Sequence, residues 1–142
     1  IDPNRPKNAR YKIYDFPKGE IVFPLNKIPK GIDTLVLVEG VFDALWLFQM
    51  GIPAVAILGN QMTVAQANII KKICNRVVDM FDNDEGGRIA RNFAREKLGK
   101  TFPYYVVDYP EGVKDPCDCS QVEIGSMLYK KSNILKRNIK RL

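Results

Sequence analysis

Three acidic residues each stand just beyond the end of an apolar run of the sequence. Glu39 follows the run 34–38 (TLVLV), and Asp82 and Asp84 follow the run 76–81 (RVVDMF). Carboxylates in close proximity resist joint ionisation unless a cation neutralises them. Hard oxygen ligands of this kind suit Mg²⁺ or Mn²⁺. If the two runs are parallel strands of one sheet, these acids meet at one edge and form a metal site.

A glycine pair follows the second group of acids. Gly86 and Gly87 stand where a helix is expected to begin. Exposed backbone N–H groups at a helix start favour phosphate, and glycine lets the anion approach closely. Arg88 and Lys114 are candidate cationic contacts for the same phosphate. The combination predicts a site that holds a metal ion against phosphate.

Further acids lie within reach of the same edge. Asp43 is one helical turn beyond Glu39, and we expect it to support the metal ligands. Asp115 and Asp118 belong to a Pro/Gly-rich segment, 110–118, which by itself is typical of an ordinary turn. If that segment follows a strand of the same sheet, it brings both acids towards the site as supporting ligands.

Rival interpretations of the acids are tested by spacing. A calcium loop of EF-hand type would have Gly86 at its fifth position and Phe93 at its twelfth, so two essential ligands are missing. A dinucleotide-binding turn would need G-x-G-x-x-G where residues 39–42 are EGVF. A phosphatase with Asp82 as its nucleophile stays open, although it leaves Glu39 without a role. A solvated acidic turn without metal is the remaining alternative.

The histidine and cysteine content limits the possible classes of enzyme and indicates the cellular compartment. The chain has no histidine, which excludes Ser-His-Asp and Cys-His hydrolases as conventionally built. Three cysteines are an odd count that fits a reducing compartment, and the pair Cys117 and Cys119 is interpreted as structural or incidental. With no apolar stretch of about 18 residues, we expect a cytoplasmic protein, in the host cytoplasm if it is viral. Because the first residue is Ile1, we expect a fragment of a longer polypeptide.

The net charge of +6 comes entirely from the C-terminal segment 130–142, which contains six cations and no acid. Two interpretations stay open: contact with the phosphate backbone of a nucleic acid, or a solvated helix face. The six residues are Lys130, Lys131, Lys136, Arg137, Lys140 and Arg141.

Apolar β-branched runs alternate with helical periodicity from Thr34 onward, which predicts an α/β fold with a mainly parallel sheet of about four strands flanked by helices. With 142 residues, 46% of them hydrophobic, the chain has one sizeable core. We divide it into 1–33, a remnant of a preceding subdomain or an edge strand that includes the strand-like run 20–25; 34–120, the metal-binding domain; and 121–142, a C-terminal helix with the basic tail. The predicted strands are 34–38, 53–58, 76–81 and 102–107, and the predicted helices are 41–50, 63–73, 85–98 and one that begins at 120.

The sequence resembles the TOPRIM domain over about residues 34–120. Residues 38–43 match V-E-G-x-x-D, and residues 82–90 match D-x-D-x-x-G-x-x-A, in the order found in DNA primases of bacterial and phage type. Residues 114–116 are similar to the K-D-P segment of primases. A type IA topoisomerase would carry an acid on each side of a glycine where residues 86–88 are Gly-Gly-Arg.

The resemblance implies metal-dependent nucleotidyl transfer, namely RNA primer synthesis for DNA replication, with Mg²⁺ or Mn²⁺. It assigns Glu39, Asp82 and Asp84 as catalytic metal ligands. It further implies a single-stranded DNA template, nucleoside triphosphates and a replicative helicase, fused or bound, as partners. A TOPRIM-type nuclease and a non-catalytic nucleic-acid-binding module remain alternatives. Because the zinc module and most of the basic N-terminal subdomain of primases lie outside these residues, we expect the fragment to be inactive alone.

Overall fold

The computed structural model of the chain describes residues 16–131, and its centre is a four-stranded sheet. The order is β2-β1-β3-β4, and all three pairings are parallel. In the register, Leu37 lies opposite Val55 on one side and Asp79 on the other. The central strands β1 and β3 therefore leave the sheet side by side at their carboxyl ends. The strands are β1 (Ile32–Val38), β2 (Ala54–Ala56), β3 (Cys74–Asp79) and β4 (Tyr104–Val106).

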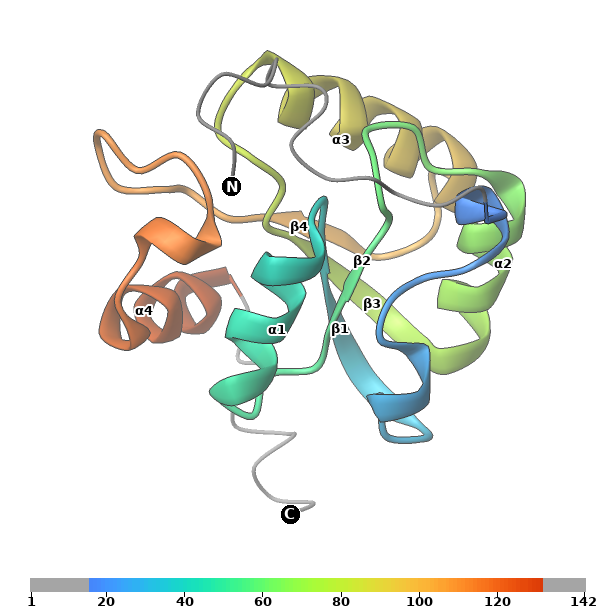
Figure 1. Cartoon of the computed structure of the whole chain (residues 1–142), viewed down its shortest axis with the longest axis horizontal. Coiled ribbons are helices and arrows are strands. Elements are labelled where there is room, and N and C mark those ends of the chain that lie inside the picture. The colour runs from blue at the N-terminus through green and yellow to red at the C-terminus, as the bar shows by residue number, and fades with distance from the viewer. Residues whose placement is uncertain (1–15, 132–142) are drawn as a thin grey trace.

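Helices cover both faces of the sheet, which confirms the predicted α/β class. The helices α1 (Val41–Gln49) and α4 (Gln121–Lys131) lie on one face, and α2 (Val64–Ile73) and α3 (Glu85–Leu98) lie on the other (Figure 1). Residues 35–38 of β1 are all apolar because alternate ones enter the two hydrophobic clusters on opposite faces of the sheet. No helix within residues 16–131 is long and apolar enough to cross a membrane.

The predicted elements are found, with shifted ends. Helix α3 has the predicted bounds and ends at Gly99, whose φ of 92° favours glycine. The predicted strand 76–81 instead ends at Asp79, because the amide of Phe81 donates to the Asp79 carboxylate at 2.8 Å and leaves the ladder.

The strand-like run 20–25 does not form a strand of the sheet. Residues on either side of its centre form short 3₁₀ helices, η2 (Lys18–Glu20) and η3 (Leu25–Lys27). Only Phe23 pairs with a strand, forming one antiparallel bridge to Ala56 of β2. The next residue, Pro24, has no N–H to donate, so the pairing cannot continue. The segment contacts the edge of the sheet without extending it.

Thr63 begins α2 with a capping box and joins the helix to the preceding segment. The Gln66 amide donates to the Thr63 hydroxyl oxygen at 3.1 Å, and the Thr63 amide donates to Gln66 Oε1 at 3.0 Å. The Thr63 hydroxyl also donates to the carbonyl of Gly19. This arrangement confirms the predicted helix start.

Replacing Thr63 with alanine removes the cap, and we expect the free energy of unfolding to fall by about 1 kcal/mol. Urea denaturation followed by circular dichroism measures the change. Thr101→Ala, in the exposed loop before β4, is the control and should be nearly neutral. Equal effects of the two substitutions would contradict the assigned cap.

Candidate functional site

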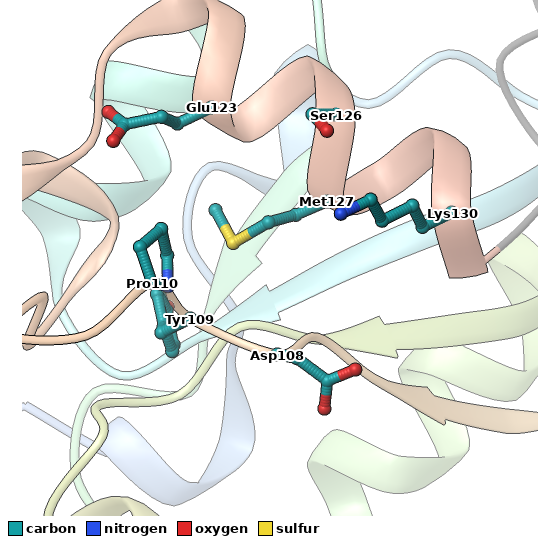
Figure 2. Close-up of a pocket in the computed structure, with 7 residues that line it drawn as sticks. All are labelled: Asp108, Tyr109, Pro110, Glu123, Ser126, Met127 and Lys130. Carbon is teal, nitrogen blue, oxygen red and sulfur yellow. The ribbon is translucent and has the colours of Figure 1, made fainter.

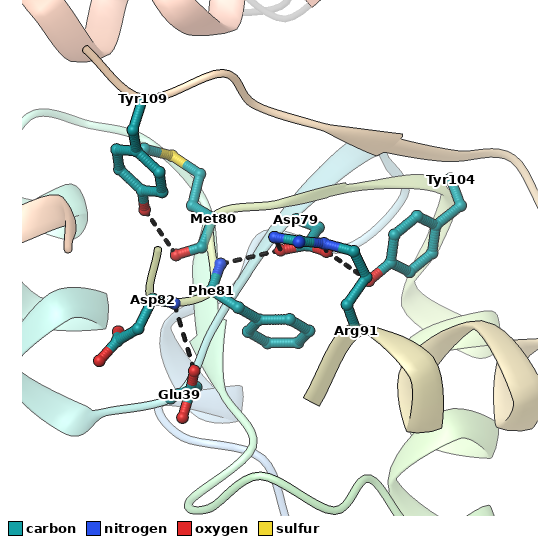
Figure 3. Close-up of polar contacts among 8 residues, drawn as sticks. All are labelled: Glu39, Asp79, Met80, Phe81, Asp82, Arg91, Tyr104 and Tyr109. Atoms are coloured by element: carbon teal, nitrogen blue, oxygen red, sulfur yellow. Dashed lines mark hydrogen bonds and ion pairs between the residues drawn. The ribbon is translucent and has the colours of Figure 1, made fainter. Parts of the chain in front are cut away.

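Glu39 and Asp82 lie against each other at the carboxyl ends of the two central strands. The Asp82 amide donates to Glu39 Oε1 at 3.2 Å (Figure 3). Ladder contacts fix both segments, since the Met80 amide donates to the Leu37 carbonyl at 2.9 Å and the Leu58 amide donates to the Glu39 carbonyl at 3.1 Å. The structure thus brings together two of the acids that the sequence placed at one edge.

The two carboxyl groups are half-buried and crowded by negative charge. Burial, and then the nearby Asp82, raises the pKa of Glu39 to about 7. Burial, and then Asp43 and Asp115, raises the pKa of Asp82 to about 6. Desolvation and like charges both disfavour the ionised form, so this edge of the sheet retains protons that ordinary acids lose.

Asp43, Asp115 and Cys117 form a second group beside the first. One ligand atom from each residue lies within 4.8 Å of the others. Asp43 comes from the first turn of α1, whereas Asp115 and Cys117 belong to the cap and the body of η4 (Pro116–Asp118). Two carboxylates and a thiol at this spacing are a donor set for a metal ion. Asp43 is therefore placed as a candidate ligand, beyond the supporting role expected from the sequence.

Cys117 is the member of this group that the sequence analysis did not name as a candidate ligand. Its C-x-C spacing without histidine had indicated a structural or incidental residue. The thiol joins the acids only because η4 folds back over α1, a tertiary contact without a local signal. Asp118, which the sequence grouped with Asp115, lies outside this donor set, and its carboxylate instead accepts from the Lys114 amide at 3.3 Å.

Asp84 differs from its neighbours because it caps α3. Its Oδ1 accepts from the Gly87 amide at 3.0 Å, and Lys114 Nζ lies 3.5 Å from its Oδ2. The Gly87 N–H, and then the Lys114 ammonium, lower the pKa of Asp84, so this exposed carboxylate stays ionised. Arg88, a predicted phosphate contact, pairs with Glu85 on the same exposed turn of the helix.

Gly87 is required by packing between α3 and the end of β3. A Cβ at this position would lie 1.7 Å from the carbonyl oxygen of Asp82. A Cβ on Gly86 would meet only the Asp84 side chain, at 3.1 Å. The sequence analysis ascribed both glycines to phosphate approach, but at Gly87 the backbone that comes close is the chain's own.

Asn83 lies between the two acids of the D-x-D segment. It holds the turn 110–118, called the acidic turn below, against that segment. Its amide donates to the Lys114 carbonyl at 2.6 Å, and its side-chain Nδ2 donates to the Val113 carbonyl at 3.2 Å. These bonds keep Asp115 beside Asp82. Sequence reasoning gave Asn83 no role, since any residue fits the middle of a D-x-D pattern.

Lys130 lines a cavity that does not include the candidate metal ligands. The cavity, of about 370 Å³, lies between α4 and the segment after β4, and Met127 and the acids Asp108 and Glu123 also line it (Figure 2). Lys131 is the last residue of α4. The other four predicted nucleic-acid contacts, Lys136, Arg137, Lys140 and Arg141, lie outside the described residues.

Comparisons with known proteins agree with this arrangement. Residues 36–120 match the family described as Toprim-like. The chain is similar to the DNA primase of Aquifex aeolicus, with 39% identity over 102 residues that cover 68% of this chain and 20% of the relative. It is also similar to the DNA primase of Clostridium acetobutylicum, with 34% identity over 123 residues that cover 82% of this chain and 20% of the relative.

Among solved structures, the chain resembles the Aquifex aeolicus primase containing the zinc-binding and RNA polymerase domains. The TM-score is 0.68 and the identity is 33%, over 82% of this chain and 31% of that one. The chain spans about a fifth of the length of the curated relatives it matches.

Gly87→Ala should push α3 away from the end of β3, because the added methyl group meets a backbone carbonyl that cannot rotate aside. We expect a loss of about 1–3 kcal/mol in the free energy of unfolding. Gly86→Ala is the matched control, since its methyl group meets only a side chain. Urea denaturation compares the two, and a Gly87→Ala variant as stable as Gly86→Ala would contradict the close approach.

The stability of the metal-free chain should depend on Glu39 and pH. A pKa of about 7 in the folded chain, above the ordinary 4.5, means that the folded state binds this proton more tightly than the unfolded state. That contribution is full below pH 4.5 and is lost as the pH rises through 7. Between pH 5 and pH 8, wild type should therefore lose stability relative to Glu39→Gln, measured by urea denaturation in EDTA. A constant difference across this range would contradict the assignment.

Proposed function

Because the chain belongs to the Toprim-like family, we propose that it is the metal-binding catalytic part of a DNA primase, which synthesises RNA primers by nucleotidyl transfer. The observation that carries the proposal is the contact of Glu39 with Asp82 at the carboxyl ends of β1 and β3. The matching relatives are DNA primases, which supports the class of reaction, and the geometry of Glu39 and Asp82 supports the residue assignment.

The residues fit divalent metal ions. Glu39 and Asp82 offer oxygen ligands from two neighbouring strand ends, Asp84 offers another from the start of α3, and Asp43 and Asp115 offer further carboxylates beside them. The Cys117 thiol is a soft donor and is not proposed as a ligand of hard ions. The raised pKa values of Glu39 and Asp82 reflect a crowding of negative charge that a cation relieves. We propose Mg²⁺ or Mn²⁺, which when bound lowers the charge on a triphosphate and polarises its reacting phosphorus.

The chain's own residues supply proton transfer and positioning. Glu39 is proposed to complete the coordination of the metal ion or to accept the proton of the attacking 3′-hydroxyl as a general base. Asp84 stays ionised as a ligand because the start of α3 and Lys114 stabilise its charge. The exposed ammonium of Lys114, with Arg88 and the N–H group of Gly86, is proposed to contact the phosphates of the incoming nucleotide.

The partners proposed are those of a primase: a single-stranded DNA template, nucleoside triphosphates and a replicative helicase. Lys130 and the basic residues that follow it are proposed to contact the nucleic-acid backbone, where each neutralised phosphate adds to affinity and to its salt dependence.

Asp82→Asn in the full-length protein should abolish primer synthesis, with a fall of at least about a hundredfold, because the substitution removes a charged ligand at the reacting phosphate. Ribonucleotide incorporation on single-stranded DNA with Mg²⁺ or Mn²⁺ measures it. Asp33→Asn, which alters an ion pair at the opposite end of β1, is the control and should retain activity. Normal primer synthesis by the Asp82→Asn protein would contradict the assignment of Asp82 as a metal ligand.

The same assay separates the two alternatives. The protein is incubated with single-stranded DNA and metal, with and without nucleotides. A primase yields newly made RNA primers only when nucleotides are present, whereas a nuclease yields shortened DNA. A non-catalytic module would yield neither product, and Mn²⁺ titration would find no site sensitive to Asp82→Asn.

A further inference from the structure

Asp79 is the last residue of β3 and is fully buried, with no exposed side-chain surface. A buried carboxylate is unfavourable unless charge and hydrogen bonds compensate it. Here both oxygens are engaged. Arg91 of α3 donates from Nε to Oδ2 at 2.6 Å and from Nη2 to Oδ1 at 3.4 Å, and the Tyr104 hydroxyl donates to Oδ2 at 2.8 Å (Figure 3). The proposed chemistry uses none of these groups.

The remaining partner of Asp79 is the backbone that leads to the metal site. Phe81 N donates to Asp79 Oδ1 at 2.8 Å, a side-chain bond to the amide two residues on that turns the chain. The next amide, Asp82 N, donates to Glu39. On the other side of this turn, the Tyr109 hydroxyl donates to the Met80 carbonyl at 2.8 Å. The direction in which Asp82 leaves the strand is thus set by a bond to Asp79.

The ion pair also fixes α3 over the same segment. Arg91 is four residues after Gly87, so both lie on the face of α3 that meets the end of β3. Gly87 packs on the Asp82 carbonyl, and Arg91 binds Asp79 one turn further along. The charge of Asp79 therefore holds the helix that carries Asp84 against the strand end that carries Asp82.

We infer that Asp79 is a positioning residue for the metal carboxylates, acting through the Phe81 amide on Asp82 and through Arg91 on the start of α3. Asp79 has no exposed surface, and its effect is on the geometry of the ligands. The inference rests on the proposed function, because it assumes that Glu39 and Asp82 bind a metal ion.

Asp79→Asn tests the role in the 142-residue chain, because it leaves a similar shape and removes the charge that Arg91 binds. Loss of a group that orients metal ligands typically weakens metal affinity 10–100-fold, so we expect the Mn²⁺ dissociation constant to rise at least about tenfold. Titration of Mn²⁺ by electron paramagnetic resonance measures it. Hydrogen exchange at the amides of Phe81 and Asp82 should accelerate, while that of Val77, within the β1–β3 ladder, should not.

Asp33→Asn is the matched control, since Asp33 of β1 pairs with Arg76 of β3 at 3.1 Å, at the other end of the same two strands. Its Mn²⁺ affinity should stay within about twofold of wild type. If Asp79→Asn fails to fold, Arg91→Lys replaces it, because lysine keeps the charge but cannot donate from two nitrogens. Arg91→Lys should also weaken Mn²⁺ binding.

Two results have distinct meanings. If wild type binds Mn²⁺ at a site sensitive to Asp82→Asn, and a folded Asp79→Asn or Arg91→Lys chain binds it as tightly, the positioning role is overturned and the proposed function stands. If wild-type binding is unaffected by Asp82→Asn, the metal assignment itself fails, and this inference fails with it.

Discussion

The parallel pairing of β1 with β3 is the constraint on which the rest of the structure depends. Its register sets Leu37 opposite Asp79. The two strands therefore end side by side, and Glu39 meets the amide of Asp82. A shift by one residue would turn every side chain of the shifted strand to the opposite face and separate the acids. The apolar residues of both strands are buried between two helical layers, which stabilises the pairing.

The site concentrates negative charge where solvent is partly excluded, which is unfavourable for the metal-free fold. Glu39 and Asp82 respond by retaining protons, whereas Asp84, exposed at the start of α3, stays ionised. Adjacent acids with such different protonation behaviour have different environments, since burial dominates for the first two and backbone N–H donation dominates for the third. A divalent cation would reverse this balance, so metal binding and stability are expected to be linked.

Two segments complete the site by packing: the turn 110–118, which is distant in the sequence, and α3, which follows the D-x-D segment directly. The acidic turn reaches the D-x-D segment through the two hydrogen bonds of Asn83, and α3 reaches it because Gly87 has no side chain. Both contacts involve the backbone on one side, so their geometry is rigid. Together with the Asp79 ion pair, they restrain the short stretch 80–84 from three directions. This restraint is what preorganised ligands require.

The sequence by itself determined the α/β class, the parallel sheet, the bounds of α3, the cap of α2 and the meeting of Glu39 with Asp82. These features follow from hydrophobic periodicity, from capping residues and from the rule that parallel strands end at one edge, all of which are local or topological. Only the tertiary structure decided that Cys117 joins Asp43 and Asp115, that Gly87 serves packing on Asp82, and that Asp79 is a buried partner of Arg91. The first depends on a contact between segments far apart in the chain, and the other two depend on how α3 packs on the end of β3, neither of which residue type and spacing encode.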